Sequence, residues 1–411
     1  MLTVFSLAFR NLWRHRRRTL ITMSALVIGM TVVIFLAGFR NSFIKLIVDD
    51  AIRSEAGAFQ VHRAGYMDST DAAPLDLNLP VDAAMEAKIL AVPGVAAVTP
   101  RVRFAGLVSS GSTSTMFIGT GIDPVREYTV CPDFRFRAVD ANGATTTPIG
   151  PERADGILMG KELADGLKVK IGDTVTLLVK TAAGGMNALD ATIVAYTLAT
   201  NPFAGKRGIF VPLPFAQKLT GMEGKATDYV AAVGDPENVD AIAGAERTAL
   251  GGTFEVQTWD VLAPFVKDAV TRLSYVLGIV GAVLLTIVIT GIMNTVLMSV
   301  YERVREIGTM MALGMKRRAI LGLFVAESLG MAATGAAVGV ALGLGIVLWL
   351  NHAGIPISPP GGGMTASLRP FLHLQFVVST VLVAFVGATV AAIYPAFKAS
   401  RLRPVEALRA L

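Results

Sequence analysis

The sequence lacks the residues from which metal centres and disulfide frameworks are built. It contains a single cysteine, Cys131, and four histidines among 411 residues. A lone cysteine cannot form a disulfide within the chain, and the histidines are scattered singly along it. We therefore expect neither a disulfide-stapled fold nor a metal site.

Motifs for nucleotide hydrolysis and for common hydrolases are also missing. Residues 156–162 read G-I-L-M-G-K-E, in which the glycines are too close together. Glu162 also stands where a phosphate-binding loop needs serine or threonine. Segment 221–225 fails in the same way, and there is no H-E-x-x-H, C-x-x-C or G-x-S-x-G motif. We expect no catalytic residue and no ATPase activity in this chain, so any energy source must lie on another subunit.

Charged residues are scarce, at 17% of the chain against about 25% in soluble proteins. Their scarcity comes from four long uncharged runs, and a bilayer core about 30 Å thick needs roughly 20 apolar helical residues. The runs predict four transmembrane helices, near residues 19–39, 273–299, 320–349 and 373–396. The first run is too long for the apolar part of a cleaved signal peptide and has no clear cleavage site, so an uncleaved anchor is the better interpretation.

Basic residues predict the orientation of these helices. Residues 1–18 carry five Lys or Arg, residues 301–318 carry five, and residues 398–411 carry four, whereas loop 350–372 carries only Arg369. The positive-inside rule places both termini in the cytoplasm of a protein of the inner membrane. The basic excess therefore belongs to the topology, and we expect no nucleic-acid partner.

The region between the first two spans is large enough to fold by itself. Its patterning is mixed α and β, with a helix expected over 81–90 and another over 162–167. Strands are expected over residues 59–62, 95–108, 116–119, 157–160, 174–180 and 191–196, with turns at 93–94, 170–173 and 184–185 and a loop over 145–155. Apolar residues with helical spacing flank this region at 43–52 and 259–273. They predict two stalk helices that continue the spans, the alternative being a pair of interfacial helices.

A short segment after the second span combines charged and apolar residues in a helical pattern. It begins with Glu302, contains the apolar side chains of Ile307, Met310, Met311 and Leu313, and ends at Gly314, a helix-stop residue. Such a helix can lie on the membrane surface. It can also insert its apolar side chains into a groove on a cytoplasmic partner.

Three segments together resemble one family. Segment 302–315 resembles the coupling segment E-R-x-R-E-I-G-x-x-x-A-L-G-A of MacB/FtsX/LolC-type permeases, the type VII ABC transporters, with Met315 in place of the last alanine. Segment 8–20 is similar to the family's A-x-R-N-L-x-R…R-T-L start, and segment 394–409 to its Y-P-A-x-x-A-S-R-L-x-P-V-E-A-L-R end. Residues 57–66 and 155–175 resemble the lipoprotein-release branch more than the antibiotic-efflux branch.

The resemblance implies a permease that forms a homo- or heterodimer and binds two cytoplasmic ABC ATPase subunits. ATP and Mg would be held by those subunits, and this chain would hold no cofactor. The residues expected to couple the permease to the ATPase are Glu302, Arg303, Arg305, Glu306, Ile307, Gly308, Met310, Leu313 and Gly314. Other expected partners are membrane lipids and a periplasmic partner or lipoprotein substrate.

Two features of the third span carry further expectations. Gly335, Gly339 and Gly343 recur every four residues, a pattern that lets helices approach closely. We expect this face to pack inside the chain, a dimer interface being the alternative. Glu327 is the one carboxylate inside a span and is expected to pair with the basic cytoplasmic ends rather than to relay protons.

The predicted fold is an integral membrane α-helical protein with four transmembrane helices and a large mixed α+β extracytoplasmic domain inserted between the first and second. Its expected parts are residues 1–18 (cytoplasmic amphipathic segment), 19–53 (first span and stalk), 54–258 (α+β domain, two lobes), 259–300 (second stalk and span), 301–318 (coupling segment), 319–350 (third span), 351–372 (extracytoplasmic loop), 373–397 (fourth span) and 398–411 (cytoplasmic tail). The expected function is ATP-driven mechanical movement that extrudes or releases a lipoprotein, lipid or other amphipathic substrate. The alternative is an FtsX-like signalling module that activates a periplasmic hydrolase.

Overall fold

The computed structural model describes residues 16–69, 73–146, 149–150, 153–197, 207–357 and 366–400. It divides into two compact units, each described here by itself. A helical unit contains residues 1–44, 271–355 and 367–411, and an α+β unit contains residues 45–270 and 356–366. Most of the predicted N-terminal segment, the end of the C-terminal tail and part of loop 351–372 lie outside the described residues.

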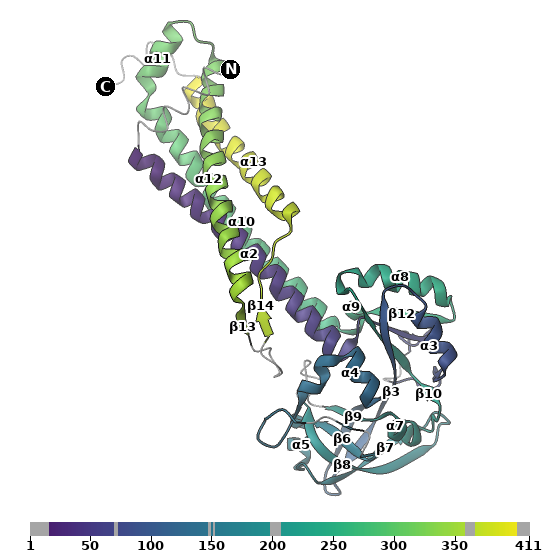
Figure 1. The fold of residues 1–411 in the computed structure, drawn as a ribbon. Helices are drawn as coiled ribbons and strands as arrows, with labels where there is room; N and C mark the ends of the chain where they lie inside the picture. Colours follow the sequence, from purple (N-terminus) through teal and green to yellow (C-terminus); the bar gives the residue numbers. More distant parts are fainter. Residues whose placement is uncertain are drawn as a thin grey trace. The chain divides into compact units, whose positions relative to one another are not determined.

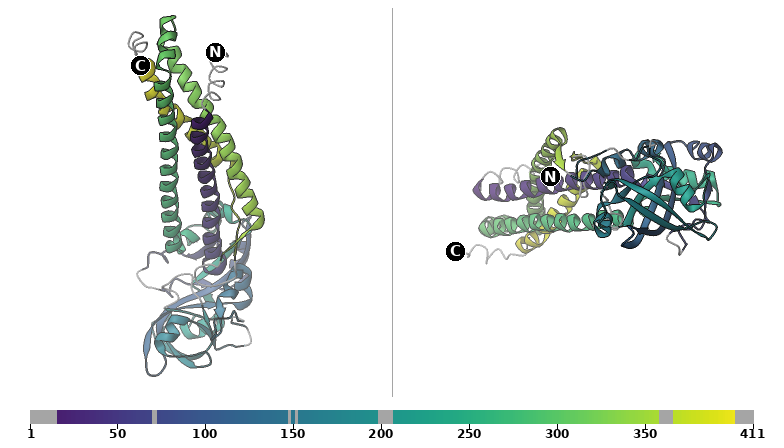
Figure 2. Two further views of the ribbon diagram at one scale, coloured as in Figure 1. Left: turned by 90° about the vertical axis from the view of Figure 1, so that its left-hand side faces the viewer. Right: turned by 90° about the horizontal axis from the view of Figure 1, so that it is seen from below.

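Four long helices confirm the predicted spans. They are α2 (Arg16–Ala51), α10 (Pro264–Glu302), α12 (Arg317–Ala353) and α13 (Leu374–Ser400). Each is long and apolar enough to cross a membrane. The short helix α11 (Val304–Ala312) connects α10 to α12, and strands β13 (Ile355–Ile357) and β14 (Ala366–Leu368) lie between α12 and α13. Figures 1 and 2 show the four long helices running alongside one another.

The predicted second stalk helix is interrupted. Residues 259–273 do not form one helix, because α9 (Trp259–Leu262) ends before Ala263 and α10 begins at Pro264. Proline disfavours helical backbone in the residue before it and is well tolerated at the first position of a helix, so the break falls where the chain must restart. The apolar periodicity of this segment therefore predicts its helical conformation correctly, but it does not predict the break at Ala263.

The α+β unit is built on a ten-stranded sheet. Its strands are β1 (Phe59–Arg63), β3 (Val95–Ser109), β4 (Ser114–Ile122), β5 (Ala138–Val139), β6 (Gly156–Gly160), β7 (Thr174–Lys180), β8 (Met186–Thr197), β9 (Gly208–Pro212), β11 (Asp228–Val233) and β12 (Phe254–Thr258). Six of them close into a ring in the order β3-β4-β9-β6-β8-β7, with β7 pairing back to β3. The long strand β3 also continues into a flank of the order β12-β1-β11-β3. A separate pair of strands is formed by β2 (Leu79–Pro80) and β10 (Lys225–Ala226).

Two main hydrophobic cores follow from this arrangement. The first lies on the inner face of the ring, where Phe104 of β3 and Phe117 of β4 meet edge to face; helices α5 (Lys161–Leu167) and α7 (Leu213–Thr220) pack on it. The second lies between the flank and helices α3 (Ala83–Leu90) and α8 (Val239–Leu250). On its other face the flank meets α4 (Pro124–Val130) and the 3-10 helix η2 (Pro132–Arg137). The domain therefore has two cores that share strand β3.

Most of the expected elements of this unit are confirmed. The expected strands fall within β1, β3, β4, β6, β7 and β8, and the two expected helices match α3 and α5. Helix α3 starts at Ala83 rather than at 81, because Asp82 caps it by accepting a hydrogen bond from the Met85 amide. Helices α4, α7 and α8 and strands β9, β11 and β12 were not expected from the sequence patterns.

Candidate functional site

The segment between α10 and α12 forms a short helix with a defined stop. Arg303 separates α10 from α11, and the Ile307 amide donates to its carbonyl at 2.9 Å. At the other end Gly314 has a φ of +93°, which a residue with a side chain adopts only with strain. The amides of Gly314 and Met315 donate to the carbonyls of Met311 and Met310 at 3.0 Å. The predicted helix and its glycine stop are confirmed.

A buried ion pair ties this segment to the third span. The Arg303 guanidinium lies 3.4 Å from the Glu327 carboxylate, and both side chains are at most 10% exposed. The pair joins the residue before α11 to α12. The expectation that Glu327 pairs with a basic group near the end of its span is therefore confirmed, with Arg303 as its partner.

The apolar residues of α11 face two different environments. Ile307 is fully buried in the core of the helical unit, and Met310 and Met311 pack against the same core. The expectation that Ile307 is free to enter a partner's groove is therefore wrong: its hydrophobic side chain is buried against the chain's own helices. Leu313, by contrast, is 89% exposed. The other predicted coupling residues divide in the same way, with Gly308 and Arg303 buried and Glu302, Arg305, Glu306 and Gly314 exposed.

The exposed part of the segment thus holds two large apolar side chains, Leu313 and the less exposed Met315, set among charges. Leu313 is followed by the exposed residues Lys316, Arg317 and Arg318. An isolated exposed leucine is common on protein surfaces, but this one sits at the end of a helix that is fixed from behind by Ile307 and Arg303. Ile307 and Arg303 can therefore hold Leu313 in a fixed position relative to the helical bundle, where it can serve as a small contact surface.

The glycine face of α12 packs against α2. A Cβ atom added at Gly339 would lie 2.6 Å from the Met30 Cβ and 2.9 Å from the Val27 carbonyl oxygen. One added at Gly343 would lie 2.8 Å from the Ile34 Cβ, and one at Gly335 would overlap Leu26. The Thr31 hydroxyl donates to the Gly339 carbonyl at 3.2 Å. In the described structure this face therefore serves packing within the chain.

Ion pairs hold the last turns of the first long helix, which from residue 45 onward belong to the α+β unit. Helix α2 passes into a π-helical turn, η1 (Ile52–Ala56), before β1. The Arg53 guanidinium lies 2.7 Å from Asp133, and Arg137 donates to both carboxylate oxygens of Asp50 at 2.8 Å. Asp133 and Arg137 both lie in η2. Two ion pairs therefore hold η2 to the last turns of the helix and to η1.

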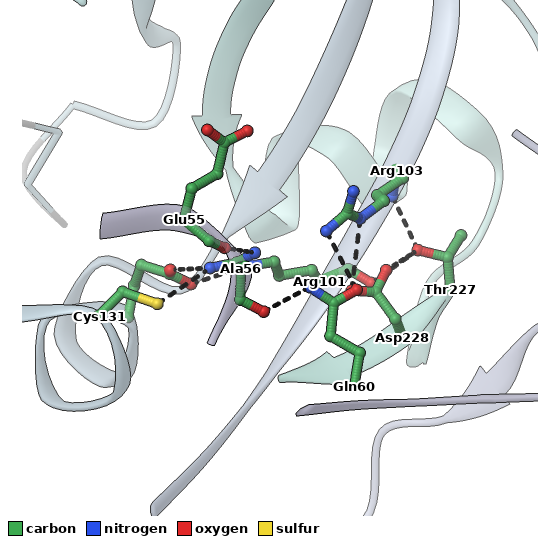
Figure 3. A network of polar contacts seen from close by, with 9 residues as sticks. Glu55, Ala56, Gln60, Arg101, Arg103, Cys131, Thr227 and Asp228 are labelled. Atoms are coloured by element: carbon green, nitrogen blue, oxygen red, sulfur yellow. Dashed lines mark hydrogen bonds and ion pairs between the residues drawn. The ribbon is translucent and has the colours of Figure 1, made fainter. Parts of the chain in front are cut away.

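A third contact at the same place is fully buried (Figure 3). Arg101 of β3 donates to both carboxylate oxygens of Glu127 in α4 and to the Glu55 carbonyl at 2.6 Å. Burial opposes the Arg101 charge, but the neighbouring Glu127 carboxylate more than offsets this and raises the pKa of Arg101. Burial also raises the pKa of the Cys131 thiol to about 12, so this cysteine is an unreactive thiol inside the network.

A second polar group lies beside it on the same face of the flank. Figure 3 shows Arg103 directed toward Asp228 and Gln60; its Nε is 3.5 Å from Asp228, and its Nη2 donates to Gln60 at 3.1 Å. His62 is buried against Tyr66, with ring centroids 4.5 Å apart. Burial lowers the pKa of His62 to about 4, so the ring is neutral at pH 7.

Sequence reasoning missed these buried networks. Arg101 and Glu127 are 26 positions apart, and Arg53 and Asp133 are 80 apart, so no local spacing signals the pairs. Among the described residues, no group of three or more His, Cys, Asp or Glu side chains is placed to hold a metal ion.

Two family models match the chain. Residues 19–248 match the MacB-like periplasmic core domain, and residues 278–404 match the FtsX-like permease C-terminal domain. The first match covers the first span and most of the α+β unit, and the second covers the remaining helices with α11.

Curated relatives match over the whole chain at low identity. The Macrolide export ATP-binding/permease protein MacB of Wolinella succinogenes is 25% identical over 98% of this chain and 60% of its own length. The protein of the same name from Bdellovibrio bacteriovorus is 36% identical over 39% of this chain and 23% of its own length. The chain spans about 60% of the length of the relatives that it matches from end to end.

Solved structures match the α+β region. The periplasmic region of MacB from Actinobacillus actinomycetemcomitans covers 51% of this chain and 92% of its own, with 9% identity and a TM-score of 0.34. The extracellular domain of the transporter YknZ from Gram-positive bacteria covers 49% of this chain and 99% of its own, with 10% identity and a TM-score of 0.32.

Proposed function

The chain belongs to the family with a MacB-like periplasmic core domain, and from this premise we propose that it is the permease subunit of an ABC transporter whose ATPase is a separate subunit. The complex contains two such ATPase subunits, which hold ATP and Mg, and two permease subunits. The helices lie in the inner membrane with both termini in the cytoplasm, and the α+β unit lies in the periplasm.

The observation that carries this proposal is the way α11 is held. Its back is fixed by the buried Ile307 and by the ion pair between Arg303 and Glu327, while Leu313 is exposed at its end. A partner that bound Leu313 would therefore push on the bundle itself rather than on a loose loop. An exposed apolar side chain that becomes buried at the centre of an interface contributes strongly to binding.

A force applied to α11 can be transmitted along α10, which precedes it directly in the chain. The helix runs from Pro264 to Glu302, so its residues form one rigid element that rises about 1.5 Å per residue. On the α+β side, η1 at the end of α2 is fixed to η2 and α4 by the ion pairs of Arg53, Arg137 and Arg101. These features support a mechanical mode of action in which helix movement is passed to the periplasmic domain.

We further propose an amphipathic substrate, namely a lipoprotein or lipid released from the membrane or a related molecule taken from the periplasm. Residues 57–66 and 155–175 support this class because they resemble the lipoprotein-release branch. The relatives that match the chain end to end carry the name of macrolide exporters, and a macrolide is also a large molecule with apolar faces. Lipids, lipoproteins and macrolides share a large apolar portion that has to be removed from a membrane or from a periplasmic surface.

The test is the substitution Leu313→Asp, compared with Leu90→Asp. Leu90 lies at the end of α3 and is 44% exposed. Leu90→Asp is therefore the control, because it makes the same change at an exposed helix end of the α+β unit. We expect Leu313→Asp to insert normally but to lose its ATPase subunit when the tagged chain is purified from native membranes. A charge in the contact would cost several kcal/mol, enough to reduce binding by more than a hundredfold.

Leu90→Asp should keep the ATPase subunit and its ATP hydrolysis. The purified chain alone should hydrolyse no ATP. If Leu313→Asp retained both the ATPase subunit and cellular function, α11 would be only a membrane-surface helix and the proposal would fail.

A further inference from the structure

A groove with apolar walls opens between three helices of the helical unit. It has a volume of about 310 Å³ and is lined by α2, α10 and α13. Val33 and Ala37 form the α2 wall, Leu277 and Leu285 the α10 wall, and Val383 part of the α13 wall. This volume is at the lower end of the range of about 300–1,000 Å³ found for ligand sites, which suits a narrow apolar chain.

Two glycines of α10 keep the groove open. Gly278 and Gly281 both line it, and a Cβ atom added at either position would meet nothing within 4 Å. They differ from Gly335, Gly339 and Gly343 of α12, where residues of α2 occupy the space that a side chain would take. The space beside Gly278 and Gly281 is therefore not used for packing within the helical unit.

A cation stands at one end of this space. Arg40 lines the groove at the C-terminal end of its α2 wall, and its guanidinium lies 5.7 Å from the centre of the Phe376 ring. Its hydrogen bonds to the Asn41 side chain are long, at 3.3 and 3.4 Å. Among the described residues, no carboxylate lies within ion-pair distance of Arg40.

The other polar side chains of the groove are already engaged. The hydroxyls of Ser379 and Thr380 both donate to the Phe376 carbonyl, at 2.8 and 2.9 Å. Arg40 is therefore the group that can bind an anion at this place. A planar guanidinium with several N–H donors is well suited to a phosphate.

The α2 wall of the groove is shorter than one leaflet. Arg40 and Val33 are seven residues apart on α2, a rise of about 10 Å. Half of a hydrocarbon core of about 30 Å is about 15 Å. A chain that starts at Arg40 and follows the groove therefore stays within one leaflet, which is the outer one in the proposed orientation.

We propose that this groove binds an anionic phospholipid of the outer leaflet, with its phosphate on Arg40 and one acyl chain beside Gly278 and Gly281. Charge favours this occupant over a helix from a second copy of the chain. Glu327 is the one carboxylate in the spans, and it already pairs with Arg303. The spans of a second copy therefore offer Arg40 no such carboxylate, whereas the lipid supplies a phosphate.

The experiment uses the full chain reconstituted into vesicles of phosphatidylglycerol and phosphatidylcholine and then extracted in mild detergent. Native mass spectrometry counts the phospholipid molecules that stay bound. Gly281→Phe places a ring at the groove, at a position where an added Cβ atom meets nothing within 4 Å. Gly291→Phe is its control, because Gly291 is also an open position on α10 but does not line the groove.

We expect one retained phospholipid in the unaltered chain and in Gly291→Phe, and loss of that lipid in Gly281→Phe. Arg40→Gln should reduce the retention of phosphatidylglycerol by about tenfold, the effect of one charge-assisted hydrogen bond. Equal retention in Gly281→Phe and the unaltered chain would overturn the proposal.

A second arm tests for a protein occupant. Efficient disulfide cross-linking of Gly281→Cys between two copies in membranes would show that a partner helix fills the groove, and would also overturn the proposal. The native Cys131 is fully buried and does not compete. The site depends on the helices spanning a membrane and not on what the permease moves, so it can fail while the proposed function stands.

Discussion

The helical unit and the α+β unit each contain one buried arginine–glutamate pair, but the pairs stand in different surroundings. Arg303 and Glu327 lie 3.4 Å apart, and the other buried polar residues described in the helical unit are uncharged, namely Ser42, Ser299, Ser328 and Thr380. Arg101 donates to both oxygens of Glu127 and also to the Glu55 carbonyl. In the α+β unit, the pair is the centre of a network that joins β3, α4 and η1.

The two units also differ in what brings their elements together. Helices α2 and α12 approach closely because Gly335, Gly339 and Gly343 leave room for the side chains of α2. The strands of the α+β unit are joined by backbone hydrogen bonds, and buried charges fix the helices on them. The helical unit should therefore be sensitive to added volume, and the α+β unit to unpaired charge.

The largest expected effect is the loss of Glu127. Glu127→Ala leaves Arg101 buried without its counter-ion, which should destabilise the α+β unit by about 3–5 kcal/mol. The double variant Arg101→Met, Glu127→Leu should recover most of this stability, because it removes both charges. Hydrogen exchange followed by mass spectrometry measures the protection of β3 and α4 in both variants. If the single variant left that protection unchanged, the network would contribute little to stability.

The contrast between the units also explains what the sequence could reveal. A membrane span is a local property, so uncharged runs located all four helices, and the spacing of Gly335, Gly339 and Gly343 showed a packing face. The sequence around these glycines does not indicate that α2 is the helix that packs against them. In the α+β unit, pairs such as Arg53 with Asp133 join residues 80 positions apart. The strands were visible as alternating patterns, but their closure into a ring depends on pairing between distant segments.

The next effect tests the sensitivity of the helical unit to volume. Gly339→Leu places a side chain against the Met30 Cβ and the Val27 carbonyl, contacts that the backbone of α2 cannot easily relieve. We expect a destabilisation of about 1–3 kcal/mol, the usual cost of overpacking. It should appear as a lower midpoint of thermal unfolding in detergent, with faster hydrogen exchange in α2 and α12.

Gly345→Leu is the matched control. Gly345 is exposed on the same helix, and a Cβ atom added there meets nothing within 4 Å. Its unfolding midpoint should stay close to that of the unaltered chain. Equal destabilisation by the two substitutions would show that helix propensity, rather than the contact with α2, determines the effect at Gly339.

The smallest expected effect concerns a buried carboxylate that has no counter-ion. Glu246 of α8 is 0% exposed, and neither of its carboxylate oxygens has a hydrogen-bond partner among the described residues. Burial raises the pKa of Glu246 from its ordinary 4.5 to about 7. The folded domain therefore holds this proton more tightly than the unfolded chain does. Its contribution to stability is complete below about pH 4.5 and is lost as the pH rises through about 7.

Glu246→Gln should accordingly match the unaltered chain at pH 5 and exceed its stability at pH 8 by about 1–2 kcal/mol, a value reduced to allow for screening by water. The buried His62, with a pKa of about 4, acts in the opposite direction at low pH, but it is present in both proteins and cancels in the difference. Denaturant unfolding at the two pH values, with Glu162→Gln on the exposed face of α5 as control, measures this difference. A gain that is the same at pH 5 and pH 8 would show that Glu246 does not change its protonation between these two pH values, and the raised pKa would be refuted.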